Sequence, residues 1–371
     1  MKVRLTLSIL LLCTLSVINI SKLEAEGNWT QKADMLTPRT RFSTSVVDGK
    51  IYAIGGENEA AGEFGEISMA VVEMYDPKTD TWQPKADMPT PRAGLATSVV
   101  DGKIYAIGGQ KKEKLQRPIG FTYRLTELPT VEMYDPVTDT WTQKADMPTP
   151  RSTRACVVDG KIYAIGGEAI GLLRGRKPWR LKTVEVYNPA TDTWGKRQSL
   201  IHARDGLRTA VVDGVIYVIG GVGWPQIANN PGPFLANVEA LKPNTHPWRK
   251  KADMSAPKAM HTASVINGKI YVIGGASRGN GPFRHLSTIE IYDPQTDRWT
   301  QAPDMPVGKS GHAAEVINGK IYILGGFRAG YKGSLLTVEV YDPGEVSQSV
   351  SPRGKLLKTW GAVKKVDILP R

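Results

Sequence analysis

One phrase, of which Val-Val-Asp-Gly-Lys-Ile-Tyr-Ala-Ile-Gly-Gly is representative, recurs six times along this chain of 371 residues. Its closing glycine pairs are spaced by 53, 58, 54, 54 and 51 residues. A period of about 50 residues is typical of architectures in which one unit cannot bury its apolar faces without neighbours. The sequence therefore predicts one repeating domain, although a chain of this length is ordinarily divided into two or more. The pairs are Gly55-Gly56, Gly108-Gly109, Gly166-Gly167, Gly220-Gly221, Gly274-Gly275 and Gly325-Gly326.

Each repeat divides into four short strands, named a to d in chain order. An Asp-Gly or Asn-Gly dipeptide, such as Asp101-Gly102, supplies the positive φ angles of a tight hairpin turn between strands a and b. Strand b is a nearly continuous apolar run, which suits burial on both faces. Strand c ends at a tyrosine in most repeats, and strand d begins at a tryptophan after an Asp-Pro-type turn. The strand c segments are 72–75, 131–134, 184–187, 238–241, 289–292 and 338–341.

Paired glycines followed by a tyrosine and a tryptophan at fixed offsets resemble the kelch repeat. The resemblance covers roughly residues 28–343 and implies an all-β fold, a six-bladed β-propeller with four antiparallel strands in each blade. The repeats depart from the pattern at two places. Repeat four has Leu241 where the others have tyrosine, and repeat three is one residue shorter between Arg151 and Gly166.

The first and last repeats are each incomplete. No tryptophan follows Tyr341 at the usual offset, whereas residues 28–35 copy the strand d sequence found at 141–147. We therefore expect the N-terminal strand to complete the last blade, which closes the ring and removes its exposed edges. The alternative uses Trp360 as the sixth strand d, and it requires a 19-residue excursion from Tyr341.

The two ends of the chain differ in composition from the repeats. Residues 1–25 begin with basic residues followed by an apolar stretch, the pattern of a cleaved secretory signal peptide. We therefore expect a secreted or periplasmic protein with no membrane span in the mature chain. Its domains are then the propeller at 26–343 and a basic tail at 344–371. Only Cys156 remains after cleavage, so no internal disulfide can form, and we expect a monomer.

Positive charge is concentrated in the loops between strands b and c. These six loops carry +7 of the formal net charge of +12. In a four-stranded meander the b–c loops and the d–a links between blades lie at the same end, and loops on a rigid scaffold commonly bind ligands. A basic surface with aromatic residues suits an anionic ligand, so we expect an acidic protein segment or an anionic carbohydrate. Nucleic acid is not expected as a ligand, because the chain is expected to be exported and its sequence contains no recognised nucleic-acid-binding module. The alternative is that the loops only keep the surface soluble.

One cation occurs at each d–a link, and the kelch resemblance implies that arginines on this face contact acidic ligands. That implication selects Arg41, Arg92, Arg151 and Arg204 as candidate ligand-binding residues. A structural role is the favoured alternative for the once-per-blade cations, because every strand c carries a glutamate that would need a partner when buried. The cations are Arg39, Arg92, Arg151, Arg204, Lys258 and Lys309, and the glutamates are Glu73, Glu132, Glu185, Glu239, Glu290 and Glu339.

Other candidates stand at irregular positions that nothing in the repeat requires. A second set lies just beyond the links, where the chain enters the inner strands. The irregular candidates are Arg124, Trp179, Arg180, Trp224, Arg284 and Tyr331. The second set is Arg41, Arg154, Arg208, His261 and His312.

Catalytic motifs are nearly absent from the sequence. The five histidines show no metal-ligand spacing, and Cys156 has no thiol partner. The sequence therefore predicts no cofactor and no metal, and it favours a binding module over an enzyme. One catalytic alternative stays open through a resemblance to the exported six-bladed kelch mutarotase that interconverts sialic acid anomers. That reaction requires an acid–base group beside a carboxylate-binding arginine, and Glu57, Glu63 and Glu66 are candidates by position.

Overall fold

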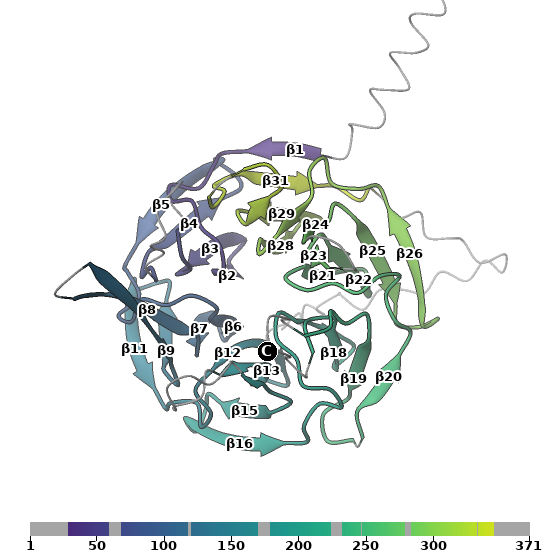
Figure 1. The fold of residues 1–371 in the computed structure, drawn as a ribbon, viewed down its shortest axis with the longest axis horizontal. Helices are drawn as coiled ribbons and strands as arrows, with labels where there is room; N and C mark the ends of the chain where they lie inside the picture. Colours follow the sequence, from purple (N-terminus) through teal and green to yellow (C-terminus); the bar gives the residue numbers. More distant parts are fainter. Residues whose placement is uncertain are drawn as a thin grey trace, which may run out of the picture.

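Six four-stranded antiparallel sheets surround a central channel in the structure of this protein, a computed structural model (Figure 1). The structure describes residues 29–58, 68–117, 120–169, 179–223, 232–245, 247–278, 283–331 and 333–344. This architecture confirms the predicted six-bladed propeller. Within these ranges no helix is long and apolar enough to cross a membrane. The predicted signal peptide at 1–25, the tail from residue 345 and Trp360 lie outside the described residues.

Strand a is innermost and strand d outermost in every blade. Blades 1 to 3 consist of β2 (Ser43–Val47), β3 (Lys50–Ile54), β4 (Val72–Asp76) and β5 (Thr81–Lys85); β6 (Ala96–Val100), β7 (Lys103–Ile107), β10 (Val131–Asp135) and β11 (Thr140–Lys144); and β12 (Ser152–Val158), β13 (Lys161–Ala169), β15 (Val184–Asn188) and β16 (Thr193–Arg197).

Blades 4 to 6 follow the same order, with the first strand of the chain as the last strand d. They consist of β17 (Arg208–Val212), β18 (Val215–Ile219), β19 (Val238–Leu241) and β20 (Arg249–Lys251); β21 (Thr262–Ile266), β22 (Lys269–Ile273), β25 (Ile289–Asp293) and β26 (Arg298–Ala302); and β28 (Ala313–Ile317), β29 (Lys320–Leu324), β31 (Val338–Tyr341) and β1 (Trp29–Lys32).

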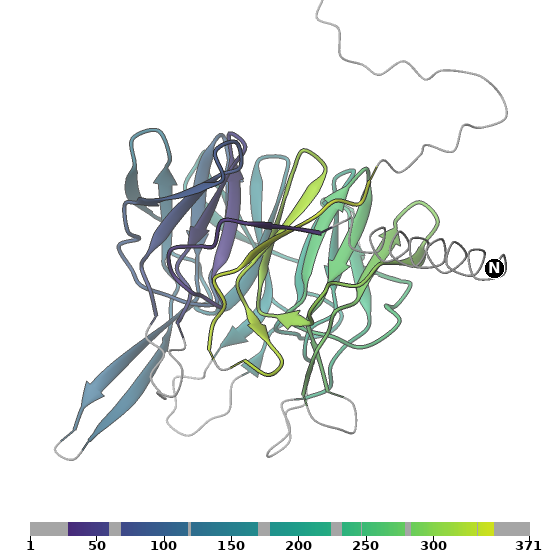
Figure 2. The same ribbon diagram turned by 90° about the horizontal axis from the view of Figure 1, so that it is seen from above.

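The remaining strands belong to the b–c loops and the d–a links. They are β8 (Gln110–Gln116), β9 (Phe121–Glu127), β14 (Trp179–Arg180), β23 (Ala276–Ser277), β24 (Arg284–His285), β27 (Lys309–Ser310) and β30 (Phe327–Arg328). The longest insertion is the two-stranded ribbon of β8 and β9, which Figure 2 shows extending well beyond the blades.

Closure of the ring follows the prediction from the incomplete repeats. β1 pairs antiparallel with β31, and Trp29 stands opposite Tyr341 in the register. Their ring centroids are 5.0 Å apart. The same tyrosine–tryptophan pair occurs in blade 1, where the centroids of Tyr75 and Trp82 are 5.1 Å apart. The N-terminal strand therefore serves as strand d of blade 6 and makes the same tyrosine–tryptophan contact as strand d of blade 1.

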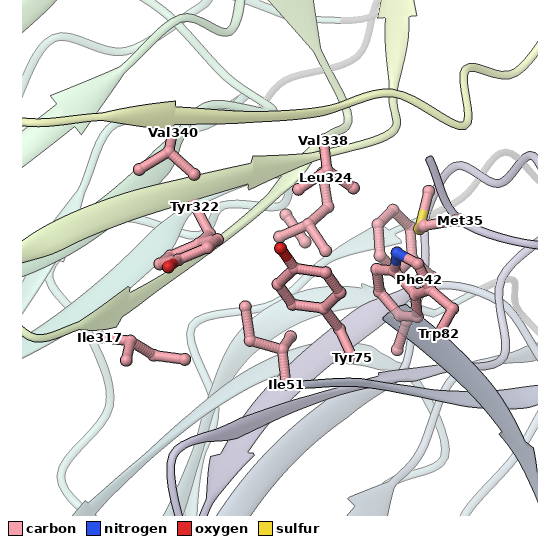
Figure 3. Packing of buried hydrophobic residues seen from close by; sticks show 12 residues of the cluster. Met35, Phe42, Ile51, Tyr75, Trp82, Ile317, Tyr322, Leu324, Val338 and Val340 are labelled. Carbon is pink, nitrogen blue, oxygen red and sulfur yellow. The ribbon is translucent and has the colours of Figure 1, made fainter. Parts of the chain in front are cut away.

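Apolar side chains are buried mainly between neighbouring blades. Figure 3 shows the junction of blades 6 and 1, where Tyr75 lies beside Tyr322 of blade 6 and Trp82 of its own blade. The Tyr75 hydroxyl donates to Asp80 Oδ1 at 2.6 Å, and that oxygen also accepts the Ala33 N–H at 2.9 Å. The Trp82 indole N–H donates to the Ala33 carbonyl at 2.9 Å. The repeated tyrosines and tryptophans thus join one blade to the next.

The glycine pairs permit close approach of neighbouring backbones. A Cβ on Gly55, whose φ is +62°, would lie 2.6 Å from the Arg92 carbonyl oxygen of the next blade. The contact is tightest in the shortened third repeat, where a Cβ on Gly167 would lie 1.8 Å from the Ser152 carbonyl oxygen. There the register of β12 against β13 shifts between Ser152 and Arg154. A side chain at such positions would displace main chain, so only glycine fits.

Candidate ligand-binding site

The six link cations form a buried ring of ion pairs with the strand c glutamates. In blade 2, Arg92 Nη2 lies 2.7 Å from Glu132 Oε2, and both side chains are almost completely buried. Burial lowers the pKa of Arg92 to about 10, although Glu132 opposes the shift. This buried cation ring comprises Arg39–Glu73, Arg92–Glu132, Arg151–Glu185, Arg204–Glu239, Lys258–Glu290 and Lys309–Glu339.

Three of the predicted ligand-binding residues, Arg92, Arg151 and Arg204, belong to this ring. Each is fully buried, and each also donates to backbone carbonyl oxygens of its own blade. Arg92, for example, donates to the Thr130 carbonyl at 2.9 Å. Every such contact is internal, which matches the structural alternative raised by the sequence. We therefore leave these three residues out of the proposed site.

Arg41 is placed differently, at the mouth of the central channel. Its side chain is 37% exposed, and it donates to Glu57 Oε1 at 3.1 Å and to Gln110 Oε1 of blade 2 at 2.7 Å. Its φ is +52°, in the region that Gly94 occupies at the same position of blade 2. A non-glycine residue held there stores backbone strain, which is commonly found at functional sites.

Two further arginines line the channel at equivalent positions of blades 3 and 4. Arg154 lies opposite Ile165 and Arg208 lies opposite Ile219, each near the N-terminal end of the innermost strand of its blade. Burial lowers the pKa of both groups, and each is also lowered by a neighbouring cation, Arg41 for Arg154 and Arg154 for Arg208. Asp205 opposes both shifts. Positive charge is thus concentrated at this side of the channel.

Asp205 lies near Arg41, Arg154 and Arg208, and Glu168 lies near Arg41. Glu168 stands opposite Arg180 in the pairing of β13 with β14. Burial and the nearby Asp205 carboxylate raise the pKa of Glu168 to about 7, against the opposing effect of Arg180 and Arg41. Burial opposes a rise at Arg41, but Glu57, Asp205 and Glu168 together raise its pKa. We call this group the channel-mouth cluster: Arg41, Glu57, Gln110, Arg154, Glu168, Arg180, Asp205 and Arg208.

The channel itself has a cavity of about 220 Å³ next to the cluster. Residues from the innermost strands of all six blades line it, including Arg154, Arg208, Thr262 and Glu315. His312 also lines it, and burial together with Lys309 and Arg208 lowers the His312 pKa to about 3. His312 is therefore neutral at physiological pH. The charged groups that reach this cavity from blades 3 and 4 are cationic.

Four of the irregular candidates, here called the rim residues, are not members of the channel-mouth cluster: Arg124, Trp179, Arg284 and Tyr331. Trp179 is 45% exposed and Tyr331 is 49% exposed, with the Arg328 guanidinium 5.3 Å from the Tyr331 ring centroid. Arg124 is exposed on β9, and Arg284 is exposed on β24. The structure therefore brings together Arg41 and Arg180 but not the whole predicted set. Trp224, Glu63 and Glu66 lie outside the described residues.

Sequence reasoning missed Gln110, Glu168 and Asp205 as members of the cluster. A signal was present, because the residue directly after the glycine pair is polar in blades 1 to 3 and apolar in blades 4 to 6. These residues are Glu57, Gln110, Glu168, Val222, Ala276 and Phe327. Across the described part of the chain, no group of three or more His, Cys, Asp or Glu side chains could hold a metal ion.

Family comparisons agree with the architecture. The family described as the KLHDC2/KLHL20/DRC7 Kelch-repeats domain matches residues 10–221 and 197–326, and the Kelch motif matches residues 308–345. These matches cover well over half of the chain. The protein therefore belongs to the kelch-repeat family.

Individual relatives share the repeats but not the full length. Kelch-like protein 15 from Danio rerio is 28% identical over 293 residues, covering 75% of this chain and 45% of the relative. Alpha-scruin from Limulus polyphemus is 26% identical over 299 residues, covering 79% of this chain and 31% of the relative. The chain thus spans less than half the length of these curated relatives. The solved structure titled "Structure of YjhT" superposes with a TM-score of 0.67 at 18% identity, covering 82% of this chain and 95% of that one.

Proposed function

We propose that this kelch propeller is an exported binding module that recognises an anionic carbohydrate or an acidic protein segment at its channel mouth. The observation that carries the proposal is the pair of channel arginines, Arg154 and Arg208. Burial and neighbouring cations lower the pKa of both guanidinium groups. An arginine nevertheless keeps its charge in proteins. The unfavourable energy of this arrangement is relieved when an anion binds.

The geometry of the arginines suits a carboxylate. A guanidinium can donate two parallel hydrogen bonds to a carboxylate, which adds direction as well as energy. Arg154 Nη1 donates to the Thr153 carbonyl oxygen at 2.7 Å, and Arg208 Nη1 donates to the Leu207 carbonyl oxygen at 3.0 Å. Each guanidinium has five N–H donors, so donors beyond these bonds can serve a ligand. The 220 Å³ cavity beside them is suited to one sugar unit or one acidic side chain.

Rim residues extend the proposed surface beyond the channel. The exposed rings of Trp179 and Tyr331 offer apolar faces for packing against a sugar or a peptide. Arg124 and Arg284 are exposed and add to the positive potential that attracts an anion before contact. Their expected contribution is therefore to the association rate more than to the final affinity.

Export forms part of the proposal and rests on the sequence of residues 1–25. The basic start and apolar stretch are typical of a secretory signal peptide. N-terminal sequencing of the protein recovered from the extracytoplasmic fraction checks this part. A first residue near position 26 supports export, and an intact N-terminus in the cytoplasm contradicts it.

A glycan array and an acidic-peptide array test the binding function. We expect the native chain to retain anionic ligands in a salt-sensitive manner, because ion pairs at a partly exposed site are screened. The double variant R154A/R208A should lose these ligands. Arg298→Ala removes an exposed arginine of β26 and serves as the matched control. Retention of the same ligands by R154A/R208A contradicts the assignment.

A second candidate function is interconversion of sugar anomers, and Glu168 favours it. Its pKa of about 7 suits a group that gives and takes a proton near neutral pH, and Arg41 and Arg180 are close enough to influence it. Removal of the anomeric hydroxyl proton and protonation of the ring oxygen would open the sugar ring, and closure on the other face gives the other anomer. NMR exchange spectroscopy of N-acetylneuraminic acid with native protein and E168Q measures this. Equal exchange in the presence and absence of native protein removes this candidate.

A further inference from the structure

In the part of the chain that the structure describes, a hydrogen-bonded latch is present at four junctions between blades. At each one a strand c tyrosine donates to an aspartate in the following c–d turn, and the same carboxylate oxygen accepts the backbone N–H of the alanine that directly follows strand d of the preceding blade. In blade 5, Tyr292 donates to Asp297 at 2.6 Å, and Ala252 N–H donates to the same oxygen at 2.9 Å. The four latches are Tyr75–Asp80–Ala33, Tyr134–Asp139–Ala86, Tyr187–Asp192–Ala145 and Tyr292–Asp297–Ala252.

Blade 4 departs from this latch at both of its side chains. Leu241 stands at the tyrosine position, and the residue at the aspartate position is His246 in the sequence. The tryptophan contact is retained, because the Trp248 indole N–H donates to the Gln198 carbonyl at 3.0 Å. The junction of blades 3 and 4 therefore keeps the tryptophan contact, but Leu241 supplies no aromatic ring at the tyrosine position and the sequence has no carboxylate at position 246.

Among the described residues, Tyr163 of blade 3 has no strand c tyrosine as a neighbour. Strand b tyrosines of four other blades pack against the strand c tyrosine of the next blade, as with Tyr105 and Tyr187, whose ring centroids are 5.8 Å apart. At the blade 3–4 junction, the corresponding neighbour of Tyr163 is Leu241. Both side chains are almost fully buried and both line a cavity.

This cavity measures about 390 Å³, and residues of β16 and of the c–d turn of blade 4 line it. It is within the size range of small-molecule sites. Figure 1 shows β16 and β20 on the outside of the propeller, away from the central channel. The site is therefore separate from the channel-mouth cluster.

The chemistry of the lining is aromatic at its base and cationic at its rim. Lys196 and Arg197 line the pocket and are exposed; burial raises the pKa of Tyr163, and Arg197 is near enough to oppose that shift. None of the described residues that line the pocket carries a carboxylate. An occupant that supplies both an aromatic ring and an anionic group therefore complements the lining in shape and in charge.

We propose that the pocket at the blade 3–4 junction binds a small aromatic carboxylate. Its ring occupies the space that a tyrosine fills at the other junctions, stacked against Tyr163 and Leu241. Its carboxylate pairs with Arg197 and Lys196, in place of the carboxylate that the aspartate supplies elsewhere. The site goes beyond the anion recognition proposed for the channel, because it lies on another surface and selects for an aromatic ring.

Calorimetric titration of the full chain with 4-hydroxyphenylacetate tests the proposal. We expect saturable one-to-one binding of the acid, and at least about tenfold weaker binding of 4-ethylphenol and of acetate, because each supplies only one of the two interactions. No saturable binding of 4-hydroxyphenylacetate by the native chain overturns the proposal. Unchanged binding when R154A/R208A is titrated separates this site from the channel site.

Two variants locate the binding. Leu241→Tyr introduces the residue that the other repeats carry, so it should fill the pocket, keep or raise thermal stability and weaken probe binding at least about tenfold. The exposed double variant K196A/R197A should keep the fold and also weaken binding about tenfold, through loss of the charge-assisted hydrogen bonds. Probe binding by L241Y or by K196A/R197A with native affinity contradicts the assignment.

Discussion

Arg154 and Arg208 occupy the same register position on the innermost strands of adjacent blades, one opposite Ile165 and the other opposite Ile219. The other four blades have uncharged side chains at this position: Ser43, Ala96, Thr262 and Ala313. Two like charges in neighbouring blades do not help the propeller to close. Their placement beside the channel cavity is instead what a ligand-binding role requires, because functional sites often retain residues that oppose stability.

Replacing Arg208 with methionine separates stability from binding. Loss of a half-buried charge that repels Arg154 should leave the free energy of unfolding unchanged or raise it, by up to about 2 kcal/mol. Binding of a glutamate-rich peptide should weaken about tenfold, the effect of losing one charge-assisted contact. Urea unfolding and fluorescence titration measure the two quantities. A variant that binds normally but unfolds much more easily indicates a structural role for Arg208.

The buried cation ring should respond in the opposite way. Arg92→Ala leaves the Glu132 carboxylate buried without its ion-pair partner, which is expected to cost about 3–5 kcal/mol of unfolding free energy. The double variant R92M/E132M should recover much of the loss, because no unpaired charge remains. A double-mutant cycle by denaturant unfolding checks this. Equal losses in the single and double variants would show that packing, and not the charge, dominates.

The fold was predictable because each repeat contains the sequence signals for its own turns and strands. Most blades contain the same signals: an Asp-Gly or Asn-Gly turn, an apolar strand b and a tyrosine–tryptophan pair. Each repeat therefore predicts the same four-stranded blade. Asp101 and Gly102 have φ angles of 49° and 71°, as the turn prediction requires. Even the closure by β1 could be read from the sequence, since the missing tryptophan of repeat six reappears at Trp29.

The site was only partly predictable, because its members come from different blades. Arg41 hydrogen-bonds Gln110, 69 residues away, and the effect of Asp205 on Glu168 depends on how two blades meet. No spacing in the sequence reports such distances. Once-per-blade arginines, in contrast, were the most visible candidates and proved to be paired inside the blades, as with Arg92 and Glu132.

Anion binding at the channel mouth should strengthen as the pH falls through 7. The pKa of Glu168 is raised to about 7, so the carboxylate gains a proton below that pH and one negative charge leaves the cluster. The arginines then attract an anion more strongly. Peptide affinity measured at about pH 6 should exceed that at about pH 8 by a fewfold to tenfold.

Glu168→Gln isolates this group from other titrations. The variant should bind at about pH 8 as tightly as the native protein does at about pH 6, and the pH dependence that remains is that of Glu315, which lines the same cavity and whose pKa burial raises to about 7. The folding stability should also be higher at low pH. Because the pKa of the Glu168 carboxyl group is raised in the folded state, this group stabilises the fold below about pH 4.5, and its contribution is lost as the pH rises through 7. E168Q should therefore gain stability over the native protein as the pH rises. An unchanged pH profile in E168Q assigns the titration to another group.

Removal of the closing strand should open the ring at one junction. A chain that starts at residue 33 lacks β1, which leaves the β31 backbone without its partner strand and Tyr341 without the Trp29 ring. Because unpaired edges recruit other strands, this chain should melt at a lower temperature and self-associate on concentration. Light scattering and thermal unfolding, compared with a chain that starts at residue 26, measure both effects. If the shorter chain is equally stable and monomeric, closure does not hold blades 1 and 6 together, and the geometry of the channel mouth must have another cause. The hydrogen bond between Arg41 and Gln110 should also be weakened in the shorter chain, because it depends on the position of blade 1.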